Sequence, residues 1–258
     1  MTNKEDIIYK CKLSSQLTDL EKDSFINIFN RVFHEGFDQD WFNWKYIDNI
    51  YGDSYIVLAY SKDDAIGARA FWRNDIDGQL CYQPCDTAVV EEFRGRGIFS
   101  KMTLAALEDT KGSYIYNYPN ENSRPGYLKL GWKVNKYFYL KFVLNRNRLK
   151  RDCEYIDDDY LVWKFGKSPV SKYYYYEKDG ESYLLYNRKN NIYYILGRFN
   201  GEYNNYFTKV DNPILFNYTA KETLLYKLLK NRGTIVSFDN GIEDGDIINI
   251  PIYKGDFF

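Results

Sequence analysis

Ten residues near the middle of the chain carry its clearest signal: Glu91-Glu92-Phe93-Arg94-Gly95-Arg96-Gly97-Ile98-Phe99-Ser100. They lie between a predicted strand at about residues 80–90 and a predicted helix at about residues 98–109. Glycines in such a turn let several backbone N–H groups converge on an anion, and the N-terminus of the helix adds partial positive charge. Arg94 and Arg96 add two full charges. The pattern predicts a phosphate-binding turn, with a tight strand-to-helix turn that holds no ligand as the alternative.

Two better-known phosphate motifs do not fit these residues. The turn has no Gly-Lys-Ser/Thr of the kind that ends a Walker loop. A dinucleotide fingerprint would need a third glycine where Ser100 stands. A nucleotide-dependent enzyme would also need Mg²⁺ ligands near Arg94, and the sequence offers no Walker-type set of them. This class of enzyme is therefore disfavoured.

The residues around the turn alternate between helix and strand patterns. Thr18-Asp19-Leu20-Glu21 forms a capping box, which predicts a helix that ends at Gly36. The other expected helices are Asp40–Tyr46, Ile98–Asp109 and Asn122–Leu130, and the expected strands are Tyr55–Tyr60, Ala65–Trp72, Leu80–Val90, Ser113–Tyr118 and Trp132–Val143. The order ααβββαβαβ indicates a mixed α/β fold with helices covering a central sheet.

The pattern of the first half starts again after a basic connector, Arg146–Arg151. Tyr160-Leu161-Val162-Trp163-Lys164-Phe165 echoes Trp41-Phe42-Asn43-Trp44-Lys45-Tyr46, at an offset of 119 residues from Trp44 to Trp163. A six-residue echo can arise by chance. We therefore ask whether other elements recur at the same offset.

Two further elements do recur at this offset. The mapping places the helix after the turn on Thr219–Lys230 and the strand Ser113–Tyr118 on Arg232–Ser237. We therefore expect a duplication, with residues 1–147 and 148–258 as two domains of related fold. At the same offset Gly97 falls on Phe216. The second domain is therefore expected to be a degenerate copy without a phosphate turn, which covers the first domain or shapes its acceptor pocket.

Composition excludes several classes of function. The 258 residues include 35 Lys+Arg and 36 Asp+Glu, a net charge of −1, so no general electrostatic grip on nucleic acid is expected. No apolar run reaches the roughly 18–20 residues of a membrane span, and the polar start Met1–Asp6 is unlike a signal peptide, so we expect a cytoplasmic protein. With four cysteines and His34 as the single histidine, no metal site is expected. Any chemistry must therefore work largely without histidine.

The turn resembles a motif of the GCN5-related N-acetyltransferase (GNAT) family. The pyrophosphate loop of that family reads Gln/Arg-x-x-Gly-x-Gly/Ala. Arg94-Gly95-Arg96-Gly97-Ile98-Phe99 matches it at Arg94 and Gly97 and departs from it at Phe99, where the family has a small residue.

A second segment makes the resemblance more specific. Asn120–Trp132 is similar to the family pattern Asn-x-x-Ala-x-x-x-Tyr-x-x-x-Gly-Phe, with Asn120 at the coenzyme-contacting asparagine and Tyr127 at the tyrosine that often acts as general acid. The distance between the two segments, one helix and one strand, is also that of the family. The Trp44-Lys45-Tyr46 segment resembles members linked to surface-polysaccharide biosynthesis.

The resemblance implies both a fold and an activity. The fold would be a mixed, mostly antiparallel central sheet flanked by helices, followed by a degenerate second half. The activity would be acyl-CoA-dependent N-acyl transfer, with acetyl-CoA as the donor and the primary amine of a small molecule, such as an amino sugar or a nucleotide-linked amino sugar, as the acceptor. The implied coenzyme-binding residues are Ala88, Val89, Val90, Arg94, Gly95, Arg96, Gly97, Ile98, Phe99 and Asn120.

Two residues are candidates for the catalytic steps. Acyl transfer from a thioester to an amine needs no protein nucleophile, only a placed thioester, a free amine and an acid for the leaving thiolate. Tyr127 is the candidate acid, with a core tyrosine as the alternative, and Asp86 is the candidate base, acting through water. The backbone N–H of Val89 is the candidate oxyanion donor. The runner-up function is a non-catalytic acyl-CoA-binding or scaffold protein, and the oligomeric state, monomer or homodimer, is left open.

Overall fold

The computed structural model describes residues 6–229, 232–242 and 248–256. The chain folds into two compact units: unit 1 comprises residues 1–133 and 236–248, and unit 2 comprises residues 134–235 and 249–258. These bounds differ from a division after residue 147. Strand β6 (Lys133–Phe142), which the sequence analysis assigns to the first half, pairs with β11 (Ile214–Thr219) of unit 2.

Unit 1 is built on a mostly antiparallel sheet, as expected. Its strands are β1 (Ile7–Leu13), β2 (Tyr55–Ser61), β3 (Asp64–Arg73), β4 (Cys81–Val89), β5 (Ser113–Asn117) and the Val236–Asn240 part of β12 (Gly233–Asn240), in the order β1-β2-β3-β4-β5-β12. Neighbouring strands are antiparallel except β4 and β5, which run parallel. Strand β1 is absent from the sequence-based prediction, although Ile7, Tyr9 and Cys11 alternate toward the core.

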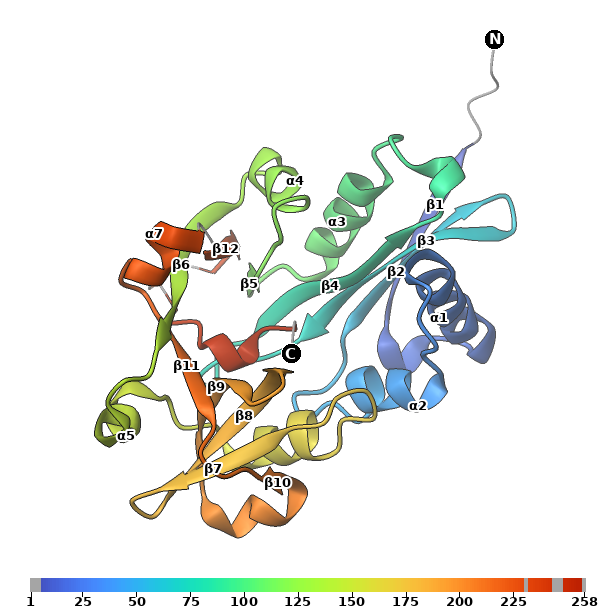
Figure 1. Cartoon of the computed structure of the whole chain (residues 1–258). Helices are drawn as coiled ribbons and strands as arrows, with labels where there is room; N and C mark the ends of the chain where they lie inside the picture. The colour runs from blue at the N-terminus through green and yellow to red at the C-terminus, as the bar shows by residue number, and fades with distance from the viewer. Residues whose placement is uncertain (1–5, 230–231, 243–247, 257–258) are drawn as a thin grey trace. The chain divides into compact units, whose positions relative to one another are not determined.

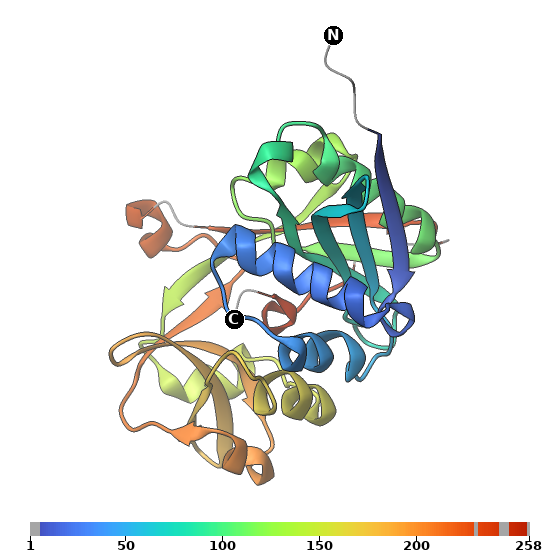
Figure 2. The same cartoon turned by 90° about the vertical axis from the view of Figure 1, so that its right-hand side faces the viewer.

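Helices cover both faces of this sheet. Unit 1 contains α1 (Asp19–Phe33), α2 (Gln39–Phe42), α3 (Ile98–Asp109) and α4 (Arg124–Lys129), and α2 continues into a π-helical turn, η2 (Asn43–Ile47). Figures 1 and 2 show α1 and α2 on one face and α3 on the other. The predicted capping box of Thr18 and Glu21 is present, but α1 ends at His34 in the left-handed conformation (φ 57°), before the expected stop at Gly36.

Aromatic side chains account for much of the core beneath α1. Phe25, Phe42 and Tyr46 have no exposed surface and Trp41 has 3%, and their rings contact one another. These rings pack as core and do not form an exposed groove. The high aromatic content of the chain therefore serves packing here.

Unit 2 has its own sheet. Its strands are β6, β11, β9 (Ile192–Phe199), β8 (Glu181–Lys189), β7 (Tyr174–Lys178) and β10 (Thr208–Lys209), in that spatial order. Strands β7, β8 and β9 are antiparallel neighbours, and β11 runs parallel to β9. The helical segments are η4 (Arg146–Arg148), α5 (Leu149–Asp152), α6 (Asp158–Tyr160), η5 (Leu161–Gly166), η6 (Gly201–Tyr206), α7 (Leu224–Leu229) and η7 (Ile252–Lys254).

The element order of unit 2 repeats that of unit 1. In each unit a short α-helix runs into a π-helical turn, α2 into η2 and α6 into η5, and each turn carries a buried lysine, Lys45 or Lys164. Three antiparallel strands come next, and then one strand parallel to the third. The echo around Trp44 and Trp163 therefore marks a structural repeat.

The other mappings at the offset of 119 residues do not hold. The counterpart of β5 is β11, not Arg232–Ser237, because β9 and β11 are joined only by the 3-10 helix η6 and the short β10, whereas helix α3 joins β4 to β5. Most of Arg232–Ser237 lies in β12, and its residues from Val236 onward pair with β5 itself. The expected helix Thr219–Lys230 appears as α7 at Leu224–Leu229, with Lys230 outside the described residues. Within the described part of the chain, no helix has the length and apolarity that a membrane crossing requires.

Candidate active site

The parallel strands β4 and β5 separate after a short paired stretch. They pair only through Cys81 with Tyr114 and Tyr82 with Ile115, while β4 continues to Val89. Beyond Tyr82 the register therefore gives β4 no partner on its β5 side. We call this opening the β4/β5 fork.

A β-bulge shapes β4 along the fork. Ala68 pairs with Ala88 and Ala70 pairs with Cys85, so Arg69 of β3 stands opposite two residues, Asp86 and Thr87. Asp86 adopts the left-handed conformation (φ 42°), which is uncommon for any residue with a Cβ. Bulges of this kind redirect side chains and occur often beside active sites.

The predicted phosphate turn comes directly after β4. After the 3-10 helix η3 (Glu91–Phe93), Gly95 and Gly97 both have a φ of 75°, and α3 begins at Ile98. No heavy atom lies within 4 Å of the position of a Cβ on either glycine. The first bond within the helix runs from Lys101 N–H to the Gly97 carbonyl, so the earlier amides of α3 face an open turn. The turn is open enough to receive an anion against its backbone.

The two arginines of the turn lie on its surface. Arg94 Nε donates to the Val89 carbonyl at 3.1 Å, and Arg96 Nη2 donates to the Glu92 carbonyl at 3.0 Å. Neither forms an ion pair with a carboxylate in the described part of the chain. Both positive charges therefore stay beside the turn and available to a phosphate.

The other residues assigned to the coenzyme divide into buried and exposed positions. Ala88, Val90 and Ile98 are at most 4% exposed, so only their backbones could meet a ligand. Val90 N–H donates to the Ile66 carbonyl of β3. Because backbone groups alternate along a strand, the N–H of Val89 points to the opposite side, into the fork.

Phe99 is directed away from the turn. Its ring meets the Tyr127 ring edge-on at 5.6 Å and lies 4.5 Å from the Arg69 guanidinium. A Cβ at Gly126 of α4 would lie only 3.1 Å from this ring. The bulky side chain therefore packs between α3 and α4, and the departure from the family motif leaves the turn backbone clear.

Asn120 has a local role in addition to its predicted one. Its Oδ1 accepts the N–H groups of Asn122 and Ser123 at 3.1 and 2.9 Å, which supports the start of α4. The amide nitrogen of this exposed side chain is the part that a coenzyme could contact.

The hydroxyl of Tyr127 lies in a buried polar set that joins three elements. Tyr127 is 3% exposed. Its oxygen accepts from Arg69 Nη2 at 2.9 Å and from Asn117 Nδ2, at the end of β5, at 2.5 Å. Arg69 Nη1 also donates to Thr87 Oγ1, in the bulge, at 2.7 Å. The set thus bridges β4 and β5 where the two strands separate.

This arrangement orients the Tyr127 proton. A phenol oxygen accepts two hydrogen bonds and donates one, and both acceptor positions are occupied. The proton must therefore point in the remaining direction, away from Arg69 and Asn117. Arg69 is a fully buried cation that has no carboxylate partner among the described residues, and its Nε has no hydrogen-bond partner there either.

Asp86 reaches the fork from the other face of the sheet. Its Oδ2 pairs with Lys45 Nζ at 2.7 Å and accepts a hydrogen bond from the Tyr46 hydroxyl, both from the turn after α2. Tyr127 lies on the α3 face, in the core cluster of Ile98 and Met102. The structure does not bring the two predicted catalytic residues into contact. They approach the bulge of β4 from opposite faces.

Sequence analysis missed three residues of this site: Arg69, Asn117 and Lys45. Arg69 interrupts an otherwise apolar strand, Ala65–Trp72, and a charge in a buried strand is a usable signal of function. Asn117 and Lys45 carry no comparable signal, because their partners come from other elements.

Comparisons with known proteins support the fold. No family model matches the chain, and no curated protein sequence matches it. A GCN5-related N-acetyltransferase from Kribbella flavida has a TM-score of 0.55 and 12% identity, over 90% of this chain and 71% of that one. A GCN5-related N-acetyltransferase from Anabaena variabilis ATCC 29413 also has a TM-score of 0.55 and 12% identity, over 91% of this chain and 73% of that one. At such low identity the likeness shows the fold alone, and the chain has a GNAT-like fold over about 90% of its length.

Proposed function

We propose that this chain, whose fold is that of GCN5-related N-acetyltransferases, is an acyl-CoA-dependent N-acyltransferase with its active site at the β4/β5 fork. One observation carries the proposal. An oriented, buried tyrosine hydroxyl lies at the fork of a strand that leads directly into an open glycine turn with two available arginines. These features match the needs of a thioester donor that ends in a pyrophosphate.

Acetyl-CoA would bind from the turn toward the bulge. Its pyrophosphate would meet the backbone N–H groups that come after Gly97, together with Arg94 and Arg96. Its extended arm would run along β4 at Ala88–Val90 and use backbone groups that β5 leaves without a register partner. The thioester would then lie near the bulge, within reach of the Tyr127 proton.

The chain's own groups would serve each step of the transfer. The neutral amine attacks the thioester carbonyl, a C–N bond forms, and the N–H of Val89 stabilises the oxyanion. The C–S bond then breaks, its electron pair goes to sulfur, and Tyr127 Oη donates the proton that gives the thiol. The nearby Arg69 guanidinium favours the negative charge that develops on sulfur, because charges interact strongly where water is excluded.

Asp86 would serve the amine. A carboxylate acting through water can remove the proton that an ammonium acceptor must lose before attack. Asp86 lies on the α1 face with Lys45 and Tyr46 on its Oδ2. The acceptor would therefore approach from this face, opposite to Tyr127. An amino sugar or a nucleotide-linked amino sugar is the acceptor class that we propose, supported by the resemblance of the Trp44–Tyr46 segment, and the cytoplasm is the proposed location.

The test is coenzyme release from acetyl-CoA against a panel of amines, preceded by calorimetry with acetyl-CoA alone. We expect binding of acetyl-CoA and thiol release with at least one amino sugar. Binding without release for any amine would favour the non-catalytic acyl-CoA-binding protein. Absence of acetyl-CoA binding would overturn both functions.

A further inference from the structure

Unit 2 contains a second fork built like the first. Strands β9 and β11 pair from Ile192–Ile214 to Tyr194–Phe216 and then separate, while β9 continues to Phe199 and β11 to Thr219. Asn217 occupies the position on β11 that Asn117 occupies on β5. Each asparagine accepts, through Oδ1, the N–H of the tyrosine next in the chain, at 2.7 Å in Asn217 and 2.8 Å in Asn117.

The chain itself covers the edge of β9 in this second fork. Arg198 N–H donates to the Glu154 carbonyl at 2.8 Å, and Ile156 N–H donates to the Arg198 carbonyl at 2.9 Å. Gly197 permits this approach, because a Cβ there would lie 2.7 Å from Ile156 Cγ1 and 2.9 Å from the Glu154 oxygen. The segment Glu154–Ile156 therefore occupies the edge along which an extended ligand would pair.

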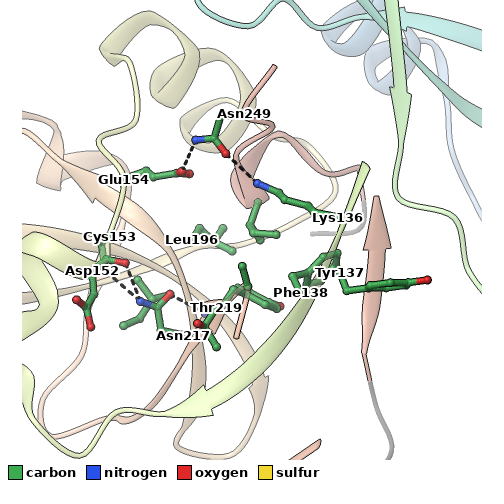
Figure 3. A pocket seen from close by; sticks show the side chains of 14 residues that line it. Lys136, Tyr137, Phe138, Asp152, Cys153, Glu154, Leu196, Asn217, Thr219 and Asn249 are labelled. Carbon is green, nitrogen blue, oxygen red and sulfur yellow. Dashed lines mark hydrogen bonds between the residues drawn. The ribbon is translucent and has the colours of Figure 1, made fainter. Parts of the chain in front are cut away.

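A pocket remains beside the covered edge. It has a volume of about 250 Å³, below the roughly 300–1,000 Å³ typical of sites for drug-sized ligands, so a small ligand is indicated. Phe138, Ile195 and Leu196 give it an apolar wall. Lys136, Glu154 and Asn249 form a polar wall, which Figure 3 shows as a connected row of side chains.

The polar wall holds two opposite charges apart. Lys136 Nζ donates to Asn249 Oδ1 at 3.0 Å, and Asn249 Nδ2 donates to Glu154 Oε1 at 3.4 Å. The amide thus stands between the ammonium and the carboxylate, which do not form a direct ion pair. The third charged residue of the lining, Asp152, pairs with Lys141 at 2.9 Å and with Arg151 at 3.3 Å. Its charge is therefore already balanced.

The pocket chemistry selects one class of ligand. A simple anion would be attracted by Lys136 and repelled by Glu154, and a simple cation would meet the reverse. A small zwitterion satisfies both, with its carboxylate at Lys136 and its ammonium at Glu154. An apolar side chain on the same molecule would cover Phe138 and Leu196.

We propose that this pocket binds a free α-amino acid with an apolar side chain. The proposal does not rest on the transferase activity, because the residues of the pocket all lie in unit 2 and none belongs to the β4/β5 fork. The second fork has lost the phosphate turn and its extended-ligand edge, and it has kept a small pocket in which a ligand can regulate or stabilise the chain.

The test is calorimetry on the full chain with leucine and phenylalanine. Matched analogues are 4-methylpentanoate, which lacks the ammonium, and 3-methylbutylamine, which lacks the carboxylate. We expect at least one amino acid to bind and both analogues to bind at least tenfold more weakly. No binding of either amino acid at millimolar concentrations, or equal binding of an analogue, would overturn the proposal.

Two variants locate the site. Lys136→Met and Glu154→Gln should each weaken amino-acid binding about tenfold. Glu154→Gln is nearly isosteric on an exposed side chain, so it keeps the test valid should Lys136→Met fail to fold. Lys150→Met, which removes an exposed cation paired with Glu181 outside the pocket, is the matched control and should bind normally. Unchanged affinity in Glu154→Gln would contradict the proposal.

Discussion

The β4/β5 fork and the β9/β11 fork start from the same backbone plan and end with different surfaces. Each has a third antiparallel strand, a parallel partner that separates from it, and an asparagine at the opening. In unit 1 the third strand leads into two glycines and a twelve-residue helix, α3. In unit 2 it leads into η6, and the segment Glu154–Ile156 lies along its edge. The connection after the third strand and the segment that covers its edge therefore determine the class of ligand that each fork can bind.

The connection after the strand has the larger consequence. A helix that starts at a glycine turn gathers N–H groups and partial positive charge at one point, which suits a phosphate. The 3-10 helix η6 is capped by its own side chain, since Asn200 accepts the N–H of Glu202, and it leads into β10 rather than into a long helix. Unit 2 therefore has the fork without the anion site.

The largest effect that would break or support this comparison is expected for Tyr127→Phe. Loss of the oriented hydroxyl should lower kcat by about 10²–10⁴-fold, because a general acid typically contributes that much. Affinity for acetyl-CoA should change little. The buried donors of Arg69 and Asn117 also lose their acceptor, which should reduce the free energy of unfolding by about 1–3 kcal/mol. Steady-state kinetics and urea unfolding measure the two effects.

Tyr116→Phe is the matched control for this change. The Tyr116 hydroxyl also makes a buried hydrogen bond, to the Asn74 carbonyl at 3.0 Å, on the same strand that carries Asn117. We expect a comparable loss of stability with kcat unchanged. Equal kcat values in the two variants would mean that Tyr127 is a core residue, and the catalytic role would be lost.

The covering segment of unit 2 is tested by Gly197→Ala. The new Cβ would overlap Ile156 and the Glu154 carbonyl, so unit 2 should lose about 1–3 kcal/mol of unfolding free energy, as in other overpacked sites. Hydrogen exchange at the Arg198 amide should accelerate. In the control Gly201→Ala the nearest atoms to the new Cβ are 3.6 Å away, so little change is expected. A neutral Gly197→Ala would show that the segment does not pack tightly on β9.

The sequence carried much of unit 1 because its signals there are local. The capping box at Thr18, the turn at Gly95 and Gly97 and the helix after it depend on neighbouring residues, and all appear in the structure. The mostly antiparallel α/β fold with a degenerate second half is confirmed as well. Strand β1 could have been predicted from the alternation of Ile7, Tyr9 and Cys11.

The polar set around Tyr127 could not be predicted, because it depends on a register. Arg69 meets Thr87 only because a bulge places two residues of β4 opposite one residue of β3. The division of the chain is similar. Strand β12 joins unit 1 through its pairing with β5, over more than a hundred residues of sequence, and no local pattern specifies that partner.

The glycine turn of unit 1 is tested by Gly97→Val. Its φ of 75° disfavours a β-branched residue, and the new side chain would stand where a phosphate must approach the backbone. Affinity for acetyl-CoA should fall at least about tenfold, or roughly 1.4 kcal/mol. Gly112→Val is the matched control, since Gly112 has a φ of 79°, equally open space, and a position beyond the far end of α3. Calorimetry that finds both variants equally impaired would place the coenzyme elsewhere.

The smallest effect concerns one carboxylate in each unit at acid pH. In unit 1, burial tends to raise the pKa of Asp53, but hydrogen bonds from Ser15 and Ser14 outweigh it and hold this pKa below its usual value. In unit 2, the hydrogen bond from Lys141 likewise lowers the pKa of Asp152. A carboxyl whose pKa is lower in the folded chain adds stability above its unfolded pKa, near 3.9, and this stability is lost as the pH falls through the folded value.

Asp53→Asn and Asp152→Asn should therefore each destabilise their own unit at neutral pH, and the difference from the unsubstituted chain should shrink below about pH 3.9. Asp53 connects two serines at the start of η1 (Ser14–Gln16), whereas Asp152 is bound by Lys141 and Arg151 at a more exposed position, so the larger effect is expected in unit 1. Hydrogen exchange resolved by segment, at neutral pH and near pH 3, measures both units in one sample. A difference that grows as the pH falls would reverse the sign and exclude these hydrogen bonds as the source of stability.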